Sequence, residues 1–187
     1  MTRVRLSTTI TSMALGCGLC VFSSLIYGQG NSNTKMDSGS TKMMKSSDTK
    51  FATGAAQGGM AEVQLGQLAV QKADNADVKA FGQHMVDDHT KANDELKGVA
   101  EKEGLTLPAS LNAKDQALMS KLQNLSGGAF DKAYIKAMVK DHEEDVKEFQ
   151  KEANNGKDPQ LKDFASKTLP TLQSHLDMAK STDAKVK

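Results

Sequence analysis

Two nearly identical segments, MVDDH from Met85 to His89 and MVKDH from Met138 to His142, stand far apart in the chain. The chain has only four histidines in 187 residues, so half of them end matching segments. A helical period of about 100° per residue places each of these histidines among apolar neighbours. We therefore predict that the segments lie on two equivalent core helices, with both histidines facing the core.

The residues around each histidine repeat the same pattern. On a predicted helix over 76–103, His89 falls within an apolar arc of Val78, Phe81, Met85, Ala92, Leu96 and Ala100. On a predicted helix over 130–153, His142 falls within a similar arc of Tyr134, Met138, Val146, Phe149 and Ala153. His84 is about 140° from His89 around the helix, so we expect it on or near the solvent face.

Capping and breaking residues delimit the helices. Asn75 is placed to cap one helix and Gly104 to end it, while Asp158 followed by Pro159 is typical of another helix start. The predicted helices cover about 53–73, 76–103, 113–124, 130–153 and 160–180. Short turns join the first two and the last two. This order predicts an antiparallel four-helix bundle with one extra short helix and one longer crossover.

The composition agrees with an all-α fold. The chain has no Trp, two Tyr and three Pro, and it is rich in residues that favour helices over sheets. We expect one bundle domain over 51–181, followed by a flexible tail over 182–187.

The N-terminal residues are typical of an export signal. Arg3 and Arg5 precede a long apolar run that is broken by Gly and Ser, which predicts a signal peptide over 1–28. A retained membrane anchor is one alternative, and a lipid-modified Cys17 is another. Residues 29–50 are mostly Ser, Thr, Lys, Gly and Asn, which predicts a disordered polar linker. Three methionines in that linker are candidate soft ligands for Cu(I), although a linker without a metal is the simpler interpretation: Met36, Met43 and Met44.

Cysteine positions and charge exclude several classes of function. Both cysteines, Cys17 and Cys20, lie in the signal segment, so the mature chain would lack disulfides and thiolate metal sites. Removal of Arg3 and Arg5 changes the formal net charge from +1 to −1. No basic block with interleaved aromatic residues suggests nucleic-acid binding. We also expect no transmembrane span in the mature chain.

Polar residues on the other two long helices match the two core histidines. Glu62 lies in the small-residue face of the first helix, and His175 lies on the flank of the last helix, where Pro170 is expected to introduce a kink. Counted from their shared turn, Glu62 and His89 stand at a similar height. His142 and His175 differ by up to one helical turn unless the kink draws them together. The sequence therefore predicts one inward polar residue per long helix, near mid-bundle.

A carboxylate with neutral imidazoles is a suitable ligand set for a divalent metal such as Zn, Fe, Mn or Cu. We predict candidate ligands at Glu62, Asp88, His89, Asp141, His142 and His175. Asp88, Asp141 and Asp145 could instead orient the imidazole rings. The alternative is a buried hydrogen-bond network that fixes the register of the helices without metal.

Several motifs together resemble one bacterial family. The segments GMAEVQLGQLA, FGQHMVDDH, FDKAYIKAMVKDH and LPTLQSHLDMA are similar to those of the domain of unknown function 4142 family. The resemblance covers about residues 51–181 and implies a ferritin-like helical bundle, without a settled activity. The motif positions it carries over are Glu62, Asp88, His89, Asp131, Tyr134, His142 and His175. Tyr134 and Asp131 are more typical of packing and of a first-turn acid than of a catalytic pair.

The chain departs from ferritin-like di-iron proteins, which place Glu-x-x-His motifs on two helices. Val86 and Val139 occupy the positions where those glutamates would stand. The most concrete prediction is an exported, metal-binding or stress-related envelope protein, periplasmic or associated with the outer membrane. The alternative is a non-catalytic structural or interaction module of the envelope whose Glu and His network only specifies the fold. A metal-dependent enzyme is the weakest prediction, because the sequence shows no cofactor fingerprint and no paired nucleophile and base.

Overall fold

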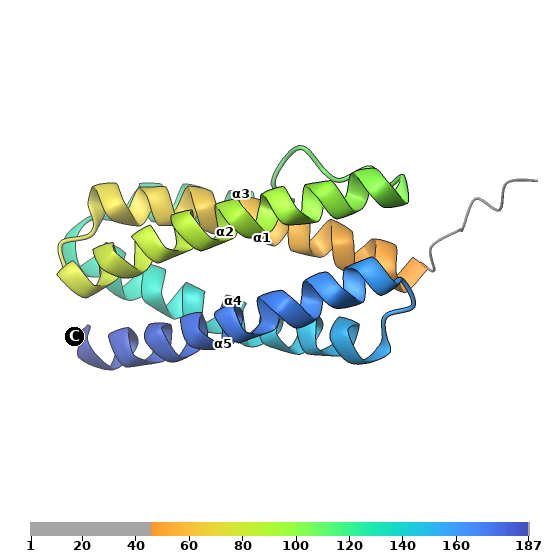
Figure 1. Ribbon diagram of the computed structural model, residues 1–187. Helices are drawn as coiled ribbons and strands as arrows, with labels where there is room; N and C mark the ends of the chain where they lie inside the picture. Colours follow the sequence, from red (N-terminus) through yellow and green to blue (C-terminus); the bar gives the residue numbers. More distant parts are fainter. Residues whose placement is uncertain (1–45, 187) are drawn as a thin grey trace, which may run out of the picture. The chain divides into compact units, whose positions relative to one another are not determined.

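The computed structural model describes residues 46–186, and this part of the chain is entirely helical. Its helices are α1 (Ser46–Lys72), α2 (Ala76–Glu103), α3 (Ala113–Gln123), α4 (Gly127–Asn155) and α5 (Pro159–Lys185) (Figure 1). The all-α prediction, with four long helices and one short one, is confirmed. Among these described helices, none combines the length and hydropathy that a bilayer crossing requires.

Two helix ends differ from the prediction. α1 begins at Ser46 rather than near Thr53, so residues 46–50 are helical and not linker. α5 continues to Lys185, so most of the predicted tail over 182–187 is helical as well. In both cases tertiary contacts hold a polar segment. Asp48 is buried and accepts a hydrogen bond from the backbone N–H of Asp158, between α4 and α5, and Lys185 lies 3.0 Å from a carboxylate oxygen of Asp77. The predicted signal peptide over 1–28 and the linker methionines lie outside the described residues.

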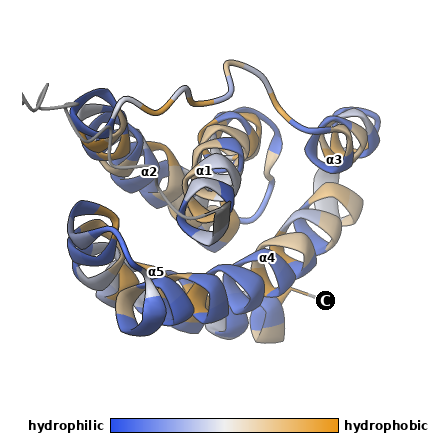
Figure 2. Ribbon diagram, turned by 90° about the vertical axis from the view of Figure 1, so that its right-hand side faces the viewer, coloured by the Kyte–Doolittle hydropathy of each residue, from blue (hydrophilic) through white to orange (hydrophobic). Residues whose placement is uncertain are grey.

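The long helices form two antiparallel hairpins, α1 with α2 and α4 with α5 (Figure 1). Viewed from the end of the bundle, one hairpin lies over the other, and α3 lies at the side near α1 and α4 (Figure 2). The crossover of residues 104–126, which includes α3, returns the chain to the end of the bundle where α2 begins, so α2 and α4 run in the same direction (Figure 1). These are the two helices that carry the matching MVDDH and MVKDH segments.

The apolar core consists of two clusters. One lies toward the α1–α2 turn and is built around Leu65, Phe81, Phe130 and Tyr134. The other lies toward the α4–α5 turn and is built around Phe51, Leu96, Phe149 and Phe164. On α2, α4 and α5, the residues of the two clusters stand on opposite sides of one buried polar position, and on α1 they do so around Ala61 and Glu62. The core is therefore divided by a polar layer.

A close approach of α1 and α2 holds one edge of this layer. A Cβ atom at Gly66 would lie 2.6 Å from the carbonyl oxygen of Gly82, and one at Gly82 would lie 2.8 Å from the Cβ of Ala69. Both distances are shorter than van der Waals contact, so only glycine allows the two backbones to come this near. Gly66 is one helical turn from Glu62, which is thereby brought close to α2.

Matching carboxylates secure the two hairpin turns. Asp131, near the start of α4, accepts hydrogen bonds from the backbone N–H groups of Asp74 at 3.2 Å and Asn75 at 2.9 Å. Asp48, in the first turn of α1, accepts from the N–H groups of Lys157 at 3.1 Å and Asp158 at 2.8 Å. The connecting turn of each hairpin thus docks near the start of the other hairpin, and this fixes the register of the two hairpins.

The turns also contain the caps predicted from the sequence. The side chain of Asn75 accepts from the N–H groups of Asp77 and Val78, and that of Asp158 accepts from Gln160 and Leu161. Gly104 ends α2 with φ 66°, in the left-handed region that favours glycine.

We predict that Asp131→Ala lowers the free energy of unfolding by about 1–3 kcal/mol, because two part-buried backbone N–H groups lose their acceptor. Guanidinium denaturation followed by circular dichroism measures this loss. Asp163→Ala, at an exposed position of α5, is the matched control and should change stability by less than about 0.5 kcal/mol. Equal effects of the two substitutions would show that the docked turn contributes nothing.

Candidate metal site in the bundle core

One polar side chain from each long helix meets in the layer that divides the core. Glu62 of α1, His89 of α2, His142 of α4 and His175 of α5 are all buried, with at most 5% of each residue exposed. The ring centroids of the three histidines lie 5.3 to 5.8 Å from one another. The expected difference in height between His142 and His175 is absent, and α5 remains one helix through Pro170.

Hydrogen bonds fix the orientation of two of the rings. The Nδ1 of His142 donates to the backbone carbonyl of Met138 at 3.0 Å. Because a carbonyl only accepts, this ring carries its proton on Nδ1 and turns the lone pair of Nε2 into the core. The Nδ1 of His89 lies 2.8 Å from Oε2 of Glu62, so its Nε2 is the second free nitrogen.

The third ring is oriented by a carboxylate at the edge of the bundle. The Nε2 of His175 lies 3.1 Å from Oδ2 of Asp88, whose side chain is one-third exposed and also lies 3.4 Å from Lys91. This leaves Nδ1 of His175 facing inward. Asp88, which the sequence offered as either ligand or orienting residue, lies in the orienting position.

Four buried atoms of the layer have no hydrogen-bond partner among the described residues: Oε1 of Glu62, Nε2 of His89, Nε2 of His142 and Nδ1 of His175. One nitrogen from each histidine lies within 4.8 Å of those of the other two. Oε1 of Glu62 lies 3.3 Å from Nε2 of His142. Each unsatisfied buried polar atom costs about 1–3 kcal/mol. A metal ion bound by the three nitrogens would remove much of this cost, so these residues fit a metal.

The space beside the layer suits an ion and little else. A cavity of about 20 Å³ is bordered by Glu62, His89 and Asp145, together with small residues of α1. A single water molecule needs about 10–15 Å³ of such space. The cavity therefore admits a water or an ion, but no organic substrate.

Carboxylates form a second group next to the layer. One oxygen from each of Glu62, Asp141 and Asp145 lies within 4.8 Å of those of the other two. Asp141 thus lies with the acids and not beside the free ring nitrogens. Lys114 of α3 lies 3.7 Å from Oδ1 of Asp141 and 2.9 Å from Oε2 of Glu144.

Burial sets the protonation of the layer. Desolvation lowers the pKa of each of the three buried histidines to about 4, so their rings are neutral near pH 7. Desolvation also raises the pKa of Glu62 to about 8, against the opposing effect of His142 and a hydrogen bond with Asp145. The pKa values of Asp141 and Asp145 are raised for the same reason. Neutral imidazole is the form that binds metals.

Other residues singled out in the sequence lie elsewhere. Asp131 binds the α1–α2 turn, as described above. The hydroxyl of Tyr134 is buried without a partner, and its ring stacks on that of Phe130 with centroids 5.7 Å apart. Burial raises the pKa of Tyr134 further. His84 is exposed, as expected.

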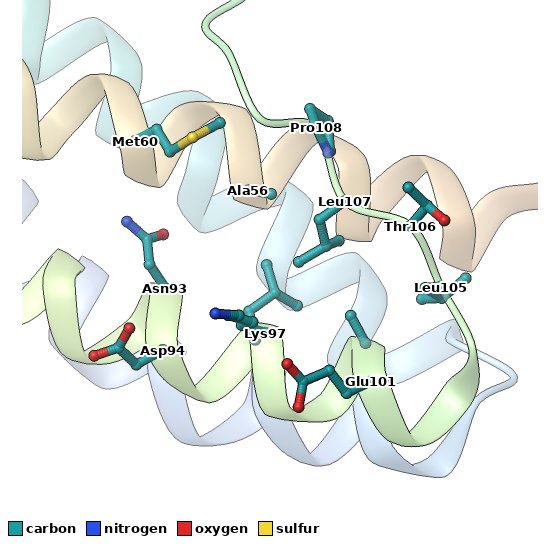
Figure 3. Close-up of a pocket in the computed structure, with 12 residues that line it drawn as sticks. Ala56, Met60, Asn93, Asp94, Lys97, Glu101, Leu105, Thr106, Leu107 and Pro108 are labelled. Atoms are coloured by element: carbon teal, nitrogen blue, oxygen red, sulfur yellow. The ribbon is translucent and has the colours of Figure 1, made fainter. Parts of the chain in front are cut away.

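A larger hollow of about 490 Å³ lies between α1, α2 and residues 105–108 (Figure 3). Met60 of α1 and Asn93 of α2 border it, with Leu107 and Pro108 on the opposite side (Figure 3). Asn93 also borders the small cavity of the polar layer. The hollow therefore approaches the layer, and the side chain of Asn93 stands between them.

Two participants were missed from the sequence. The carbonyl of Met138 stands four residues before His142, so helical geometry alone could have suggested it. Lys114 lies on the short helix, and no local signal indicates which face of the bundle that helix covers.

Comparisons with known proteins agree with this fold. The sequence matches the profile of a family described as "Domain of unknown function (DUF4142)" over residues 33–182. A search of curated proteins gave no match. A DUF305 fragment from Deinococcus radiodurans has a TM-score of 0.67 at 9% identity, covering 76% of this chain and 98% of that one.

Two further solved structures are similar. CopM in its Cu(II)-bound form has a TM-score of 0.63 at 15% identity, covering 74% of this chain and 96% of CopM. A DUF305 protein from Streptomyces coelicolor has the same score and identity, covering 74% of this chain and 93% of that one. At these identities the likeness is one of fold.

We predict that the stability of the metal-free protein falls as the pH rises from 6.5 toward 8. As the pH falls from 6.5 toward 4, the three histidines take up protons in the unfolded chain but stay neutral in the folded protein, so the stability that they contribute is lost. As the pH rises toward 8, the unfolded chain has already released the proton that the folded state keeps on Glu62, so stability is lost again. Between 4.5 and 6.5 the two effects oppose each other, because the raised pKa values of Glu62, Asp141 and Asp145 act against the lowered pKa values of the histidines.

Guanidinium denaturation in the presence of a chelator, from pH 4.5 to 8.5, measures how the free energy of unfolding depends on pH below and above 6.5. Glu62→Gln should reduce the loss of stability between pH 6.5 and 8.5. A wild-type curve that stays level between pH 6.5 and 8.5 would contradict the assignment of a buried, protonated Glu62.

Proposed function

The chain belongs to the DUF4142 family, and we propose that this member is an exported helical bundle that binds a divalent transition-metal ion through His89, His142 and His175. The observation that carries the proposal is the convergence of three neutral imidazoles, each with one nitrogen held by a hydrogen-bond partner and one left free. Glu62 and Asp88 hold two of the rings in place, which is the usual arrangement behind metal-bound histidines.

The metal-free alternative fits the geometry less well. A network that only fixes helix register would pair its buried polar atoms with one another. Here each ring is paired through one nitrogen, and the remaining nitrogens face one another across the core. Lone pairs do not hydrogen-bond to lone pairs. A protonated Glu62 can donate to Nε2 of His142, 3.3 Å from its Oε1, but this leaves Nε2 of His89 and Nδ1 of His175 unpaired, whereas a cation satisfies all three nitrogens.

The ligand set narrows the choice of metal. Of the candidates Zn, Fe, Mn and Cu, imidazole nitrogens without thiolates favour Cu(II) and Zn(II), which bind such ligands most tightly. CopM, which shares the fold, is known in Cu(II)-bound, Cu(I)-bound and Ag-bound forms. This neighbour supports copper as the first metal to test.

Binding is favoured over catalysis because the cavity at the layer, about 20 Å³, has no room for a substrate. Export is supported by Arg3 and Arg5 before an apolar run. The S. coelicolor neighbour, which is predicted to be secreted, also supports it. In the bacterial envelope, the protein would hold or pass on metal, for example under metal stress.

A second candidate function is a non-catalytic interaction module of the envelope. The hollow between α1, α2 and residues 105–108 favours it, because a largely apolar concave surface is suited to a partner (Figure 3). The two functions differ in whether metal is required.

We predict that the chelator-treated wild type binds one equivalent of Cu(II) or Zn(II), and that His142→Ala abolishes this binding by removing one of three ligands. Isothermal titration calorimetry and elemental analysis of the dialysed protein measure the stoichiometry. His84→Ala is the matched control, because His84 is exposed on the same helix as His89 and should leave binding unchanged.

His142→Gln provides a variant of more conservative volume if the alanine variant folds poorly. The metal-binding proposal is lost if the wild type binds nothing at micromolar metal, or if the double variant His89→Ala with His142→Ala keeps full binding. Either outcome would leave the interaction module as the better function.

A separate prediction concerns the residue that orients His175. Asp88→Ala should weaken metal affinity about 10–100-fold without abolishing it, because the ring loses its outer hydrogen bond but keeps its place. Asp87→Ala, at the neighbouring exposed position, should have no effect. Competition with a chromogenic chelator measures both affinities. An unchanged affinity in Asp88→Ala would show that Asp88 does not position the ring.

A further inference from the structure

An acidic groove of about 160 Å³ lies on the face of the bundle where α1, α3 and α4 meet. Five carboxylates border it, and Lys114 is the one basic residue among them: Asp115, Asp141, Glu144, Asp145 and Glu148. The groove is therefore acidic, and none of its lining residues borders the hollow of Figure 3.

The inner end of the groove adjoins the cavity of the polar layer. Ala55, Gly58 and Asp145 border both spaces. A Cβ atom added at Gly58 would meet no other atom within 4 Å, so this point is open. Small residues of α1 thus leave the carboxylate of Glu62 within reach of the groove.

Glu62 supplies an observation that surface acids do not. It is 1% exposed, and its Oε1 atom has no hydrogen-bond partner in the described part of the chain. Its oxygen forms a compact group with those of Asp141 and Asp145, all within 4.8 Å. Carboxylates held so close repel one another unless a proton or a cation lies between them.

The nearby lysine does not neutralise this group. Lys114 lies closest to Glu144, at 2.9 Å, and reaches Asp141 only at 3.7 Å. No basic side chain of the described chain forms an ion pair with Glu62 other than the histidines of the layer. Neither Lys114 nor the histidines place a positive charge at the centre of the carboxylate group, so a cation bound there would displace the protons that the raised pKa values of Glu62 and Asp145 retain.

We propose that Glu62, Asp141 and Asp145 form a second cation site, made of oxygen ligands only, at the inner end of the acidic groove. Carboxylate oxygens are the ligands of hard divalent ions such as Mn²⁺, Mg²⁺ and Ca²⁺, in contrast to the imidazole nitrogens of the layer. The two sites share Glu62, but the oxygen site requires no histidine.

The test uses Mn(II) as the probe, added to the chelator-treated full chain, with the free ion measured by its electron paramagnetic resonance signal. We expect the wild type to bind one equivalent, and Asp145→Asn to bind at least about tenfold more weakly, since a site loses affinity with each charged ligand removed. Asp163→Asn, on the exposed face of α5, is the control and should bind like the wild type.

A variant with the opposite expected effect guards against misfolding as an explanation. Lys114→Ala removes the one positive charge of the groove and should strengthen Mn(II) binding, which an unfolded protein would not do. The proposal is overturned if the wild type binds no Mn(II) at millimolar concentration, or if Asp141→Asn and Asp145→Asn both bind it like the wild type.

The two sites are separable by ligand type. His175→Ala should impair Cu(II) or Zn(II) binding while leaving Mn(II) binding intact, because His175 does not contact the carboxylate group. A wild type that binds Mn(II) but neither Cu(II) nor Zn(II) would refute the histidine site only. A wild type that binds Cu(II) or Zn(II) but no Mn(II) would refute the oxygen site only.

Discussion

Four polar side chains held at one level of an apolar bundle constrain everything else in this structure. Glu62 and three histidines lie between two hydrophobic clusters, and burial drives the rings to their neutral form and the carboxylate toward its protonated form. Such a layer is stable only if its atoms find partners. The helices supply a partner for one nitrogen of each ring, through Glu62, Asp88 and the carbonyl of Met138, and leave the others converging. The geometry of the proposed metal site follows from this incomplete pairing.

The ends of the bundle keep the layer in register. Asp131 and Asp48 each bind the backbone of the opposite hairpin turn, so neither hairpin can slide along the other without losing these four hydrogen bonds. The contact between Gly66 and Gly82 fixes the spacing of α1 and α2 near Glu62. A displacement of one helical turn, about 5.4 Å, would separate the rings. The precision needed for a metal site is thus provided by contacts far from it.

Much of the fold could be predicted because its signals are local. Helical periodicity identified the buried faces, and Asn75, Gly104 and Asp158 marked helix ends that the structure confirms. The start of α1 and the end of α5 were wrong because tertiary contacts order those polar segments, and composition carries no trace of such contacts. The position of α3 was equally hidden. Its contact with α4 through Lys114 depends on the path of the crossover, not on the residues of the helix itself.

The candidate site likewise combines features that the sequence predicts with features that tertiary contacts set. The sequence by itself determined which side chains face the core, because a helix of fixed period carries Glu62, His89 and His142 inward wherever the bundle places them. The tertiary structure alone decided that His175 stands level with the other rings, that Asp88 orients it, and that Asp141 joins Asp145 instead of the histidines. Periodicity gives the direction of a side chain around one helix. Height, hydrogen-bond partners and the free nitrogen of each ring depend on how separate helices are aligned along the bundle axis, which only the contacts between hairpins determine.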